Sequence, residues 1–529
     1  MLLITDNHPF RYETENLCRA FYPYENIKTV KSLKEIDNNN TNSNIPSDYD
    51  KITCFTSIKK RDDSIFLQAK LITPQGEYCS EKRLAAPEKC DFLSDESGAD
   101  APKPRGFHNK AKDTFRDKCE LVLAQAMFDV LTRAVGKRPK WGISTGVRPV
   151  KLFFTLLDTE NGEEGAVRYF QNELLVSREK TELTRKTAEK QKPVLALSRP
   201  DSFSLYISVP FCPTRCAYCS FVSQSIEKAA RLIPKYVELL CREIEITGSI
   251  AEKLGLRLET VYFGGGTPTS LTAHQLDEIM LAVERSFDMS RLREYTVEAG
   301  RPDTITGDKL QTLKDHSVGR ISVNPQTLSD EVLQAIGRRH TAQQAVDAFI
   351  LAKKYGFDIN MDIIAGLPLD TLGSFRNTVD TLLSMQPHNL TVHTLSMKRS
   401  SALTKSGAHP SDEQISQMLD SAADRLDAAG FYPYYLYRQS RILGNQENTG
   451  WTVPGKECLY NIYIMDETHT ILACGASAVT KLRQPHANRI ERIFNYKFPY
   501  EYNDKFDILM QRKEQITGFY EGFSNIENK

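Results

Sequence analysis

SLYISVPFCPTRCAYCS, residues Ser204–Ser220, is the segment that indicates the fold most strongly. Its first half is an apolar run typical of a buried strand, and its second half places three cysteines within eight residues: Cys212, Cys216 and Cys219. Three thiolates on one loop suit an iron–sulfur cluster, and one iron stays open when no fourth protein ligand is present. A zinc ion, the alternative, usually takes four ligands from paired knuckles, and no second Cys/His pair has that spacing. The stretch therefore predicts a reaction centre at the end of a strand.

Patterns of buried strands and amphipathic helices alternate after this stretch. The expected strands are Leu205–Val209, Glu259–Phe263, Glu294–Glu298, Arg320–Asn324, Asp358–Ile364 and Asn389–Ser396. The expected helices are Arg231–Ala251, Ala273–Phe287, Ser329–Ile336, Ala342–Tyr355 and Ser374–Met385. Because such alternation produces a parallel sheet, the sequence predicts an α/β fold with an open, partial (β/α)6 barrel over residues 201–400. Functional groups are expected at the carboxyl ends of its strands.

The sequences on either side predict two further domains. In residues 1–200, β-type runs at Ile52–Ile58 and Ser64–Thr73 and helical patterns near Ala111–Val135 and Glu163–Lys192 predict an N-terminal α+β domain of unassigned role. Residues 401–529 predict a C-terminal auxiliary α/β domain that covers the substrate. Its expected elements are a helix Asp412–Ala429, an aromatic strand at 431–439, a loop at 444–451 and a strand pair around Asn461–Ala473.

Composition narrows the possible partners and compartment. Lys plus Arg and Asp plus Glu both total 68, so the net charge gives no reason to expect nucleic acid as a partner. No apolar run approaches the about 20 residues that span a bilayer, and the first residues do not resemble a secretory signal. We therefore expect a cytoplasmic protein without a membrane span. The remaining cysteines show no metal spacing and are expected to be mostly buried: Cys18, Cys54, Cys79, Cys90, Cys119, Cys241, Cys458 and Cys474.

The C-x3-C-x2-C spacing after the first strand of a β/α barrel resembles the radical S-adenosylmethionine (SAM) superfamily. The resemblance implies a 4Fe–4S cluster on Cys212, Cys216 and Cys219, whose open iron chelates SAM. One electron from the reduced cluster would cleave SAM to methionine and a 5′-deoxyadenosyl radical. Polar groups at successive strand ends resemble the SAM-contacting positions of the family, with Asn324 replacing a glycine. The implied SAM contacts are Tyr206, Tyr218, Gly265, Gly266, Thr267, Glu298, Gln326, Arg338 and Asp362.

Within this superfamily, the segments GGGTPT, VEAG and DIIAGLP resemble the oxygen-independent coproporphyrinogen III oxidase group. The stretch Ser144–Lys151, with CAYCSF and VHTLSMKR, is similar to the HemZ-type subgroup. The resemblance implies oxidative decarboxylation of coproporphyrinogen III to protoporphyrinogen IX, with an electron donor such as a flavodoxin or ferredoxin. Lys398, Arg399 and Arg438 are candidates to hold the anionic propionates of this tetrapyrrole, although each is more often an ordinary surface cation.

Two departures from the oxidase pattern leave other functions open. Ser208 stands where the oxidase has a histidine, and Phe221 stands where it has a fourth cysteine. A haem chaperone, or another tetrapyrrole-handling protein without the dehydrogenase activity, is therefore an alternative, as is a branch that opens the haem ring. The chaperone motif H-N-x-x-Y-W is matched only partly at Tyr460–Tyr463. An RNA-modifying enzyme is disfavoured, because the short basic run Lys137–Lys140 is typical of a solvated turn. No catalytic residue is assigned from the sequence.

Overall fold

The structure is a computed structural model that describes residues 1–31, 52–87, 115–159, 162–398, 403, 409–485, 487 and 489–524. The chain divides into two compact units: the first comprises Met1–Arg185 with Arg438–Gln446, and the second comprises Lys186–Tyr437 with Glu447–Lys529. The expected barrel and most of the expected C-terminal domain fall in the second unit, and the division into three domains stays a prediction. Within the described part of the chain, no helix has both the length and the apolar character to cross a membrane.

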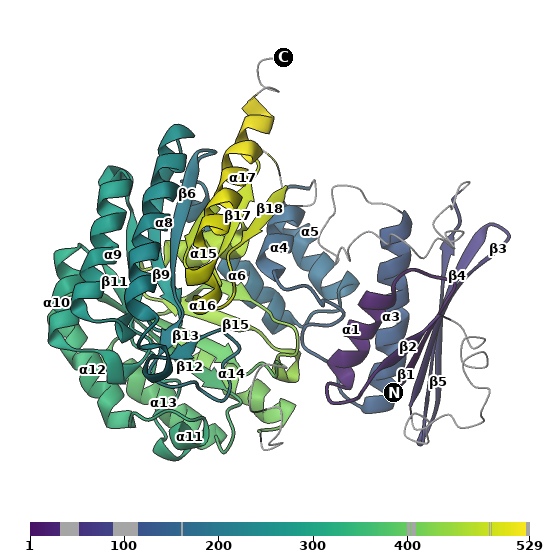
Figure 1. Cartoon of the computed structure of the whole chain (residues 1–529). Coiled ribbons are helices and arrows are strands. Elements are labelled where there is room, and N and C mark those ends of the chain that lie inside the picture. The colour runs from purple at the N-terminus through teal and green to yellow at the C-terminus, as the bar shows by residue number, and fades with distance from the viewer. Residues whose placement is uncertain are drawn as a thin grey trace, which may run out of the picture. The chain divides into compact units, whose positions relative to one another are not determined.

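The first unit is built on a five-stranded sheet with the order β2-β1-β3-β4-β5. Strand β1 pairs in parallel with β2 and β3, and the rest of the sheet is an antiparallel meander. The strands are β1 (Leu2–Asp6), β2 (Lys28–Val30), β3 (Thr53–Arg61), β4 (Ser64–Thr73) and β5 (Gly76–Ala85). Helices α1 (Arg11–Phe21) and α3 (Phe115–Val135) lie beside each other, and α3 packs on β4 and β5 (Figure 1). The expected α+β architecture is confirmed.

The helix expected over Glu163–Lys192 is divided into three pieces. These are α5 (Gly162–Arg168), the π-helical turn η2 (Tyr169–Glu173) and α6 (Arg178–Leu195), and they follow α4 (Pro149–Leu157). At the break, Leu175 has φ +56°, and the backbone oxygen of Leu174 accepts a hydrogen bond from the distant amide of Ile143 at 2.9 Å. Two polar stretches of the N-terminal region, Asn38–Asn44 and Asp95–Arg105, lie outside the described residues.

The second unit contains the predicted partial barrel. Six strands pair in parallel in the order of the chain, as one part of an eleven-stranded sheet. They are β6 (Ser202–Val209), β9 (Arg257–Gly265), β10 (Glu294–Glu298), β11 (Arg320–Ser322), β12 (Asp358–Ala365) and β13 (Asn389–Thr394). The connecting helices are α8 (Ile233–Lys253), α9 (Ala273–Ser286), α10 (Gly307–Asp315), α11 (Asp330–Ala335), α12 (Ala342–Lys354) and α13 (Leu372–Met385), seen together around the barrel strands in Figure 1.

The helix starts of the barrel are fixed by local sequence. Capping boxes begin α9 at Thr272, α12 at Thr341 and α13 at Thr371. In each box the threonine hydroxyl accepts a hydrogen bond from the backbone amide three residues later. The side chain of that later residue accepts a hydrogen bond from the threonine's own amide, so two otherwise unpaired amides have partners. This explains why the expected helix boundaries agree closely with the structure.

Residues after 409 extend both edges of the barrel sheet. On the β13 side, β15 (Asn448–Thr452) and β14 (Tyr432–Tyr437) continue it in antiparallel fashion. On the β6 side, β16 (Thr470–Cys474) is parallel to β6 and is followed by antiparallel β17 (Val479–Arg483) and β18 (Ile490–Phe494). Three further helices are α14 (Asp412–Ala428), α16 (Pro499–Asp504) and α17 (Phe506–Ser524).

Two expectations for this region are wrong. The expected loop at 444–451 contains β15, which pairs with β13 and β14. Gly450 allows this pairing, because a Cβ atom there would lie only 1.8 Å from the ring of Tyr435. The strand pair around Asn461–Ala473 begins instead with helix α15 (Leu459–Asp466). Its first amides are held by the Glu294 carboxylate, at 2.7 Å from Leu459 and 3.1 Å from Tyr460, so a long-range contact decides this helix.

Candidate active site

The three cysteines lie on the loop that leaves β6. Cys212 belongs to the short strand β7 (Phe211–Cys212), and its Sγ lies 3.5 Å from the hydroxyl of Thr267. Cys216 and Cys219 follow in a turn closed by the bond from the Cys219 amide to the Cys216 oxygen at 3.2 Å. The amide of Ala217 is also held, by the backbone oxygen of Ile336 at 2.9 Å. The loop is thus fixed at several points between its cysteines.

This donor set fits an iron–sulfur cluster. Among the described residues, no group of three or more His, Cys, Asp or Glu side chains could hold a metal ion. The ligands of a cluster each bind a different iron, so three cysteines need not converge on one point. Burial raises the pKa of the Cys212 thiol and raises that of Cys219 to about 11. Because thiolates are the ligands, cluster assembly here must release protons.

The glycine-rich end of β9 packs directly on this loop. The amide of Gly266 donates to the oxygen of Val209 at 2.8 Å, and that of Thr267 donates to the oxygen of Phe211 at 2.7 Å. A Cβ atom on Gly266 would lie 2.6 Å from the Phe211 oxygen. Gly265 has φ +105°, and a Cβ there would lie 2.8 Å from the Ser208 hydroxyl oxygen. Close packing alone explains both glycines, and their contact with SAM stays a prediction.

Glu298, the last residue of β10, and Asp362, within β12, have different proton affinities. Burial raises the pKa of Glu298 to about 7, and the charge of Asp362 adds to the effect, although the Tyr262 hydroxyl donates to Glu298 Oε1 at 2.7 Å. Burial also acts on Asp362, but the hydrogen bonding and charge of His393 outweigh it and hold the pKa of Asp362 below its ordinary value. The side-chain amide nitrogen of Asn360 donates a hydrogen bond to Asp362 Oδ1 at 2.7 Å. At neutral pH the Glu298 carboxyl is therefore partly protonated, whereas that of Asp362 is ionised.

Buried polar atoms without protein partners gather at the ends of β11 and the loop after it. Gln326, with φ +69°, bridges to β12 through its amide to the oxygen of Asp362 at 2.9 Å. Its Oε1 and the Oδ1 of Asn324 are buried without a partner in the protein. Arg338 donates to the oxygen of Asn324 at 2.7 Å and to the hydroxyl of Tyr218 at 2.9 Å, while its Nε has no partner. Unpaired buried acceptors and donors of this kind suit a polar ligand.

A stack of three tyrosine rings lies beside Glu298. The Tyr460 ring centre is 4.3 Å from that of Tyr262 and 6.1 Å from that of Tyr206, with nearly parallel planes. Tyr262 was not predicted from the sequence, and Tyr460 was predicted only as part of an incomplete chaperone motif. No pattern could have found this stack, because Tyr460 reaches the barrel from α15, outside the β/α units.

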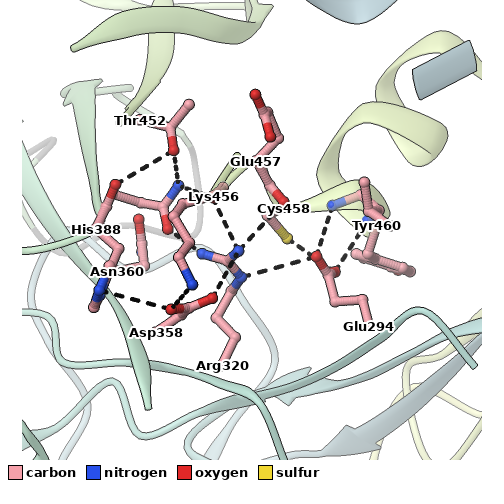
Figure 2. Close-up of polar contacts among 12 residues, drawn as sticks. Glu294, Arg320, Asp358, Asn360, His388, Thr452, Lys456, Glu457, Cys458 and Tyr460 are labelled. Atoms are coloured by element: carbon pink, nitrogen blue, oxygen red, sulfur yellow. Dashed lines mark hydrogen bonds and ion pairs between the residues drawn. The ribbon is translucent and has the colours of Figure 1, made fainter. Parts of the chain in front are cut away.

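The amino ends of the barrel strands hold α15 in place, as Figure 2 shows. The Glu294 carboxylate accepts from the amides of Leu459 and Tyr460 and from the thiol of Cys458, the last at 3.2 Å. Arg320 donates to the oxygen of Lys456 at 2.9 Å, and the Lys456 ammonium pairs with Asp358 at 2.7 Å. These contacts fix residues 456–460, and with them the ring of Tyr460.

The three cations expected to bind the substrate, Lys398, Arg399 and Arg438, differ in their surroundings. Lys398 is half buried, and burial lowers its pKa despite the nearby Cys219. Arg399 lies outside the described residues. The expectation for Arg438 is wrong: it is buried in the first unit, where it donates to the oxygens of Ser144 and Asn445 and lies over the ring of Trp141 at 5.0 Å. Its role is to hold that unit together.

The structure also describes Ser208 and Phe221, the two residues that depart from the oxidase pattern. Ser208 is buried, and its hydroxyl donates to the oxygen of Ala476 at 2.8 Å. Phe221, in contrast, has 68% of its surface exposed. Of the other cysteines that the structure describes, most are buried as expected, namely Cys18, Cys54, Cys119, Cys458 and Cys474. Cys241 is partly buried, Cys79 is exposed, and Cys90 lies outside the described residues.

Comparisons with known proteins identify the family of the chain. The model of the radical SAM superfamily matches residues 206–382. The oxygen-independent coproporphyrinogen-III oxidase-like protein HemZ of Bacillus subtilis is 38% identical over 409 residues, covering 76% of this chain and 81% of that protein. The haem chaperone HemW of the same organism is 33% identical, over 44% of this chain and 62% of its own. Among solved structures, coproporphyrinogen III oxidase (HemN) from Escherichia coli matches with a TM-score of 0.48 and 22% identity, over 61% of this chain and 73% of that one.

Proposed function

The chain belongs to the radical SAM superfamily and, within it, to the HemZ-type subgroup of the oxygen-independent coproporphyrinogen III oxidase group, and from this we propose that it oxidatively decarboxylates coproporphyrinogen III to protoporphyrinogen IX. One observation carries the proposal: besides the three-cysteine loop at the end of β6, the end of β11 and the segment after it hold polar groups whose buried atoms lack protein partners. A polar ligand beside a cluster would satisfy them.

We place a 4Fe–4S cluster on Cys212, Cys216 and Cys219. When bound, such a cluster supplies the electron that splits SAM into methionine and a 5′-deoxyadenosyl radical. The chain's own part is to hold SAM in one orientation. Glu298 receives one hydrogen bond from Tyr262 and has its other oxygen for the ribose hydroxyls, as the family pattern suggests.

The remaining SAM contacts are proposed on the same basis. The side-chain oxygens of Asn324 and Gln326 are available as acceptors for the donors of SAM. Tyr218, tied to Arg338 at 2.9 Å, has its ring fixed where the family packs adenine. The other proposed contacts are Tyr206, Gly265, Gly266, Thr267 and Asp362. Lys398, a half-buried cation near Cys219, is the proposed partner of a substrate propionate.

A haem-handling role without decarboxylation is the second candidate. It is favoured by Ser208, whose hydroxyl is already bound to Ala476 at the position where the oxidase has a histidine. Relatives called haem chaperones at 33% identity or less point the same way. In this case the cluster and SAM would still bind, but coproporphyrinogen III would not be consumed.

The deciding experiment is anaerobic incubation of the reconstituted, dithionite-reduced protein with SAM and coproporphyrinogen III. Mass spectrometry follows 5′-deoxyadenosine and the tetrapyrrole together. Deoxyadenosine with stepwise loss of two carboxyl groups supports the decarboxylase, whereas SAM cleavage with unchanged tetrapyrrole supports the second candidate. A Cys216→Ala variant is the control, since it should lose both cluster iron and SAM cleavage; full cleavage by this variant would contradict the assigned cluster. Reduced flavodoxin or ferredoxin, in place of dithionite, then tests the physiological donor.

A further inference from the structure

Arg301 lies on the loop after β10, three residues beyond Glu298. Only 3% of its side chain is exposed. A guanidinium is rarely buried so fully without a specific set of partners, because removing its charge from water is costly. None of the roles proposed above uses it.

The two edges of this guanidinium have different partners. Nε and Nη2 donate to the two carboxylate oxygens of Asp303, each at 3.0 Å. Nη1, on the other edge, donates to the backbone oxygen of Thr214 at 3.2 Å and to its hydroxyl at 3.1 Å. The same Nη1 donates to the Sγ of Cys216 at 3.6 Å. The bidentate pair with Asp303 fixes the plane of the guanidinium, and its other edge faces the cysteine loop.

The backbone of Arg301 is held as firmly as its side chain. Its carbonyl oxygen accepts from the amide of Thr304 at 2.9 Å and from the hydroxyl of Thr304 at 2.7 Å. That hydroxyl is in turn 2.7 Å from the hydroxyl of Thr269. The guanidinium therefore reaches Cys216 from a fixed base and does not depend on a mobile side chain.

This geometry has an electrostatic consequence for a cluster on these cysteines. Reduction adds one negative charge to the cluster, and a nearby buried cation stabilises the added charge. Hydrogen bonds to the ligand sulfurs act in the same direction. The carboxylate of Asp303 offsets part of the effect, but the guanidinium lies between this carboxylate and the sulfur of Cys216. The cation is the nearer charge, so its influence is the larger.

We propose that Arg301 is a positioning residue that raises the reduction potential of the cluster by donating to Cys216, in addition to anchoring Thr214. The inference rests on the proposed function only in that a cluster binds Cys212, Cys216 and Cys219. It makes reduction by a biological donor easier, which is the step that must precede SAM cleavage in this superfamily.

The test is the midpoint potential of the reconstituted full-length chain, without SAM, from an EPR-monitored redox titration. Replacing Arg301 by Gln removes the charge and, because glutamine is shorter, also removes the hydrogen bond that Nη1 donates to Cys216. We expect the reduced-to-oxidised ratio at a given potential to fall about tenfold, which corresponds to about 59 mV for a one-electron couple. Arg301→Lys keeps a cation but loses the two-edged geometry, and its potential should lie between those of Arg301→Gln and the unchanged chain.

Two control variants separate this effect from a loss of loop structure or of net charge. Thr214→Val removes a side-chain anchor of the loop and leaves the cation, so the potential should not fall. Arg215→Gln removes the same charge from an exposed side chain one residue from Cys216, and solvent screening should make its effect smaller than that of Arg301→Gln.

The outcomes are distinct. A midpoint potential in Arg301→Gln and Arg301→Lys equal to that of the unchanged chain overturns the inference, as does an equal fall in Arg215→Gln. If Arg301→Gln fails to assemble a cluster, the lysine variant still decides. Failure of the unchanged chain to bind iron and sulfide would instead defeat the proposed function itself.

Discussion

Replacing Tyr262 by Phe removes one hydrogen-bond donor from Glu298 and leaves the stacked rings in place. The Tyr262 hydroxyl donates to Glu298 Oε1 at 2.7 Å, and this bond favours the ionised carboxylate. The Tyr262 ring lies 4.3 Å from that of Tyr460, and phenylalanine retains this contact. The substitution therefore tests the hydrogen bond separately from the packing.

The expected size follows from the strength of such a bond. A hydrogen bond to a charged group contributes about 1.5–3 kcal/mol, and 1.36 kcal/mol corresponds to one pKa unit. Burial raises the pKa of Glu298 to about 7 in the unchanged chain. Only the ionised carboxylate accepts freely from ribose hydroxyls, so SAM affinity should rise as the pH passes through this value. In Tyr262→Phe the rise should occur roughly one to two pH units higher.

The assay is isothermal titration of SAM into the reconstituted, oxidised protein at several pH values around neutrality. Tyr295→Phe is the matched control, because its buried hydroxyl has no hydrogen-bond partner in the protein and the same atom is deleted from the same sheet. Its pH profile should coincide with that of the unchanged chain. An inflection at the same pH in Tyr262→Phe and in the unchanged chain would refute the reasoning, and a shift in both variants would refute the assignment to Glu298.

Three other outcomes are expected. Glu298→Gln should weaken SAM binding and remove its pH dependence while iron content stays unchanged; lost iron would place Glu298 in the support of the cluster instead. Gly266→Ala, whose Cβ would lie 2.6 Å from a backbone oxygen of the cysteine loop, should lower cluster loading severalfold, whereas Gly319→Ala, with no atom within 4 Å, should not. Burial lowers the pKa of His316, but its hydrogen bonds to the carboxylates of Asp277 and Glu284 on α9, at 2.9 and 2.8 Å, raise it overall. Because its pKa is higher in the folded state, His316 stabilises the chain at a pH below the unfolded-state pKa of about 6.5, and this contribution is lost as the pH rises through the folded-state pKa. The melting temperature of His316→Gln should therefore differ most from that of the unchanged chain under mildly acidic conditions. A difference in melting temperature that does not depend on pH would contradict this linkage.

Sequence patterns were most informative where structure is decided locally. Strand β10, expected at Glu294–Glu298, has these bounds, and the threonine capping boxes place the starts of the outer helices. The polar ends of consecutive parallel strands meet at one edge of a sheet, so the neighbourhood of Glu298, Gln326 and Asp362 followed from the strand order alone. Their SAM contacts are still predictions.

What the patterns missed depends on contacts between distant parts of the chain. Helix α15 was expected as a strand, because its apolar run carries no helical signal and its first amides are held by Glu294, 165 positions earlier than Leu459. The role of Arg301 was missed because its partners Thr214 and Asp303 lie on two loops that only the fold brings together. Arg438 was misassigned for a related reason. Its position in the chain after the sixth barrel strand does not reveal that it belongs to the first unit.

The packing around Ser208 bears on the choice between the two proposed functions. Its hydroxyl is bound to Ala476, and its backbone oxygen lies 2.5 Å from where a Cβ atom of Gly475 would be. The amide of Gly475 is in turn held by the fully buried Glu243 at 2.7 Å. An imidazole at position 208 would need the space that the Gly475–Ala476 segment fills, and that segment is anchored from behind. The serine is therefore packed against Gly475–Ala476 at the end of β6, and any decarboxylation by this chain must proceed without a histidine at that place.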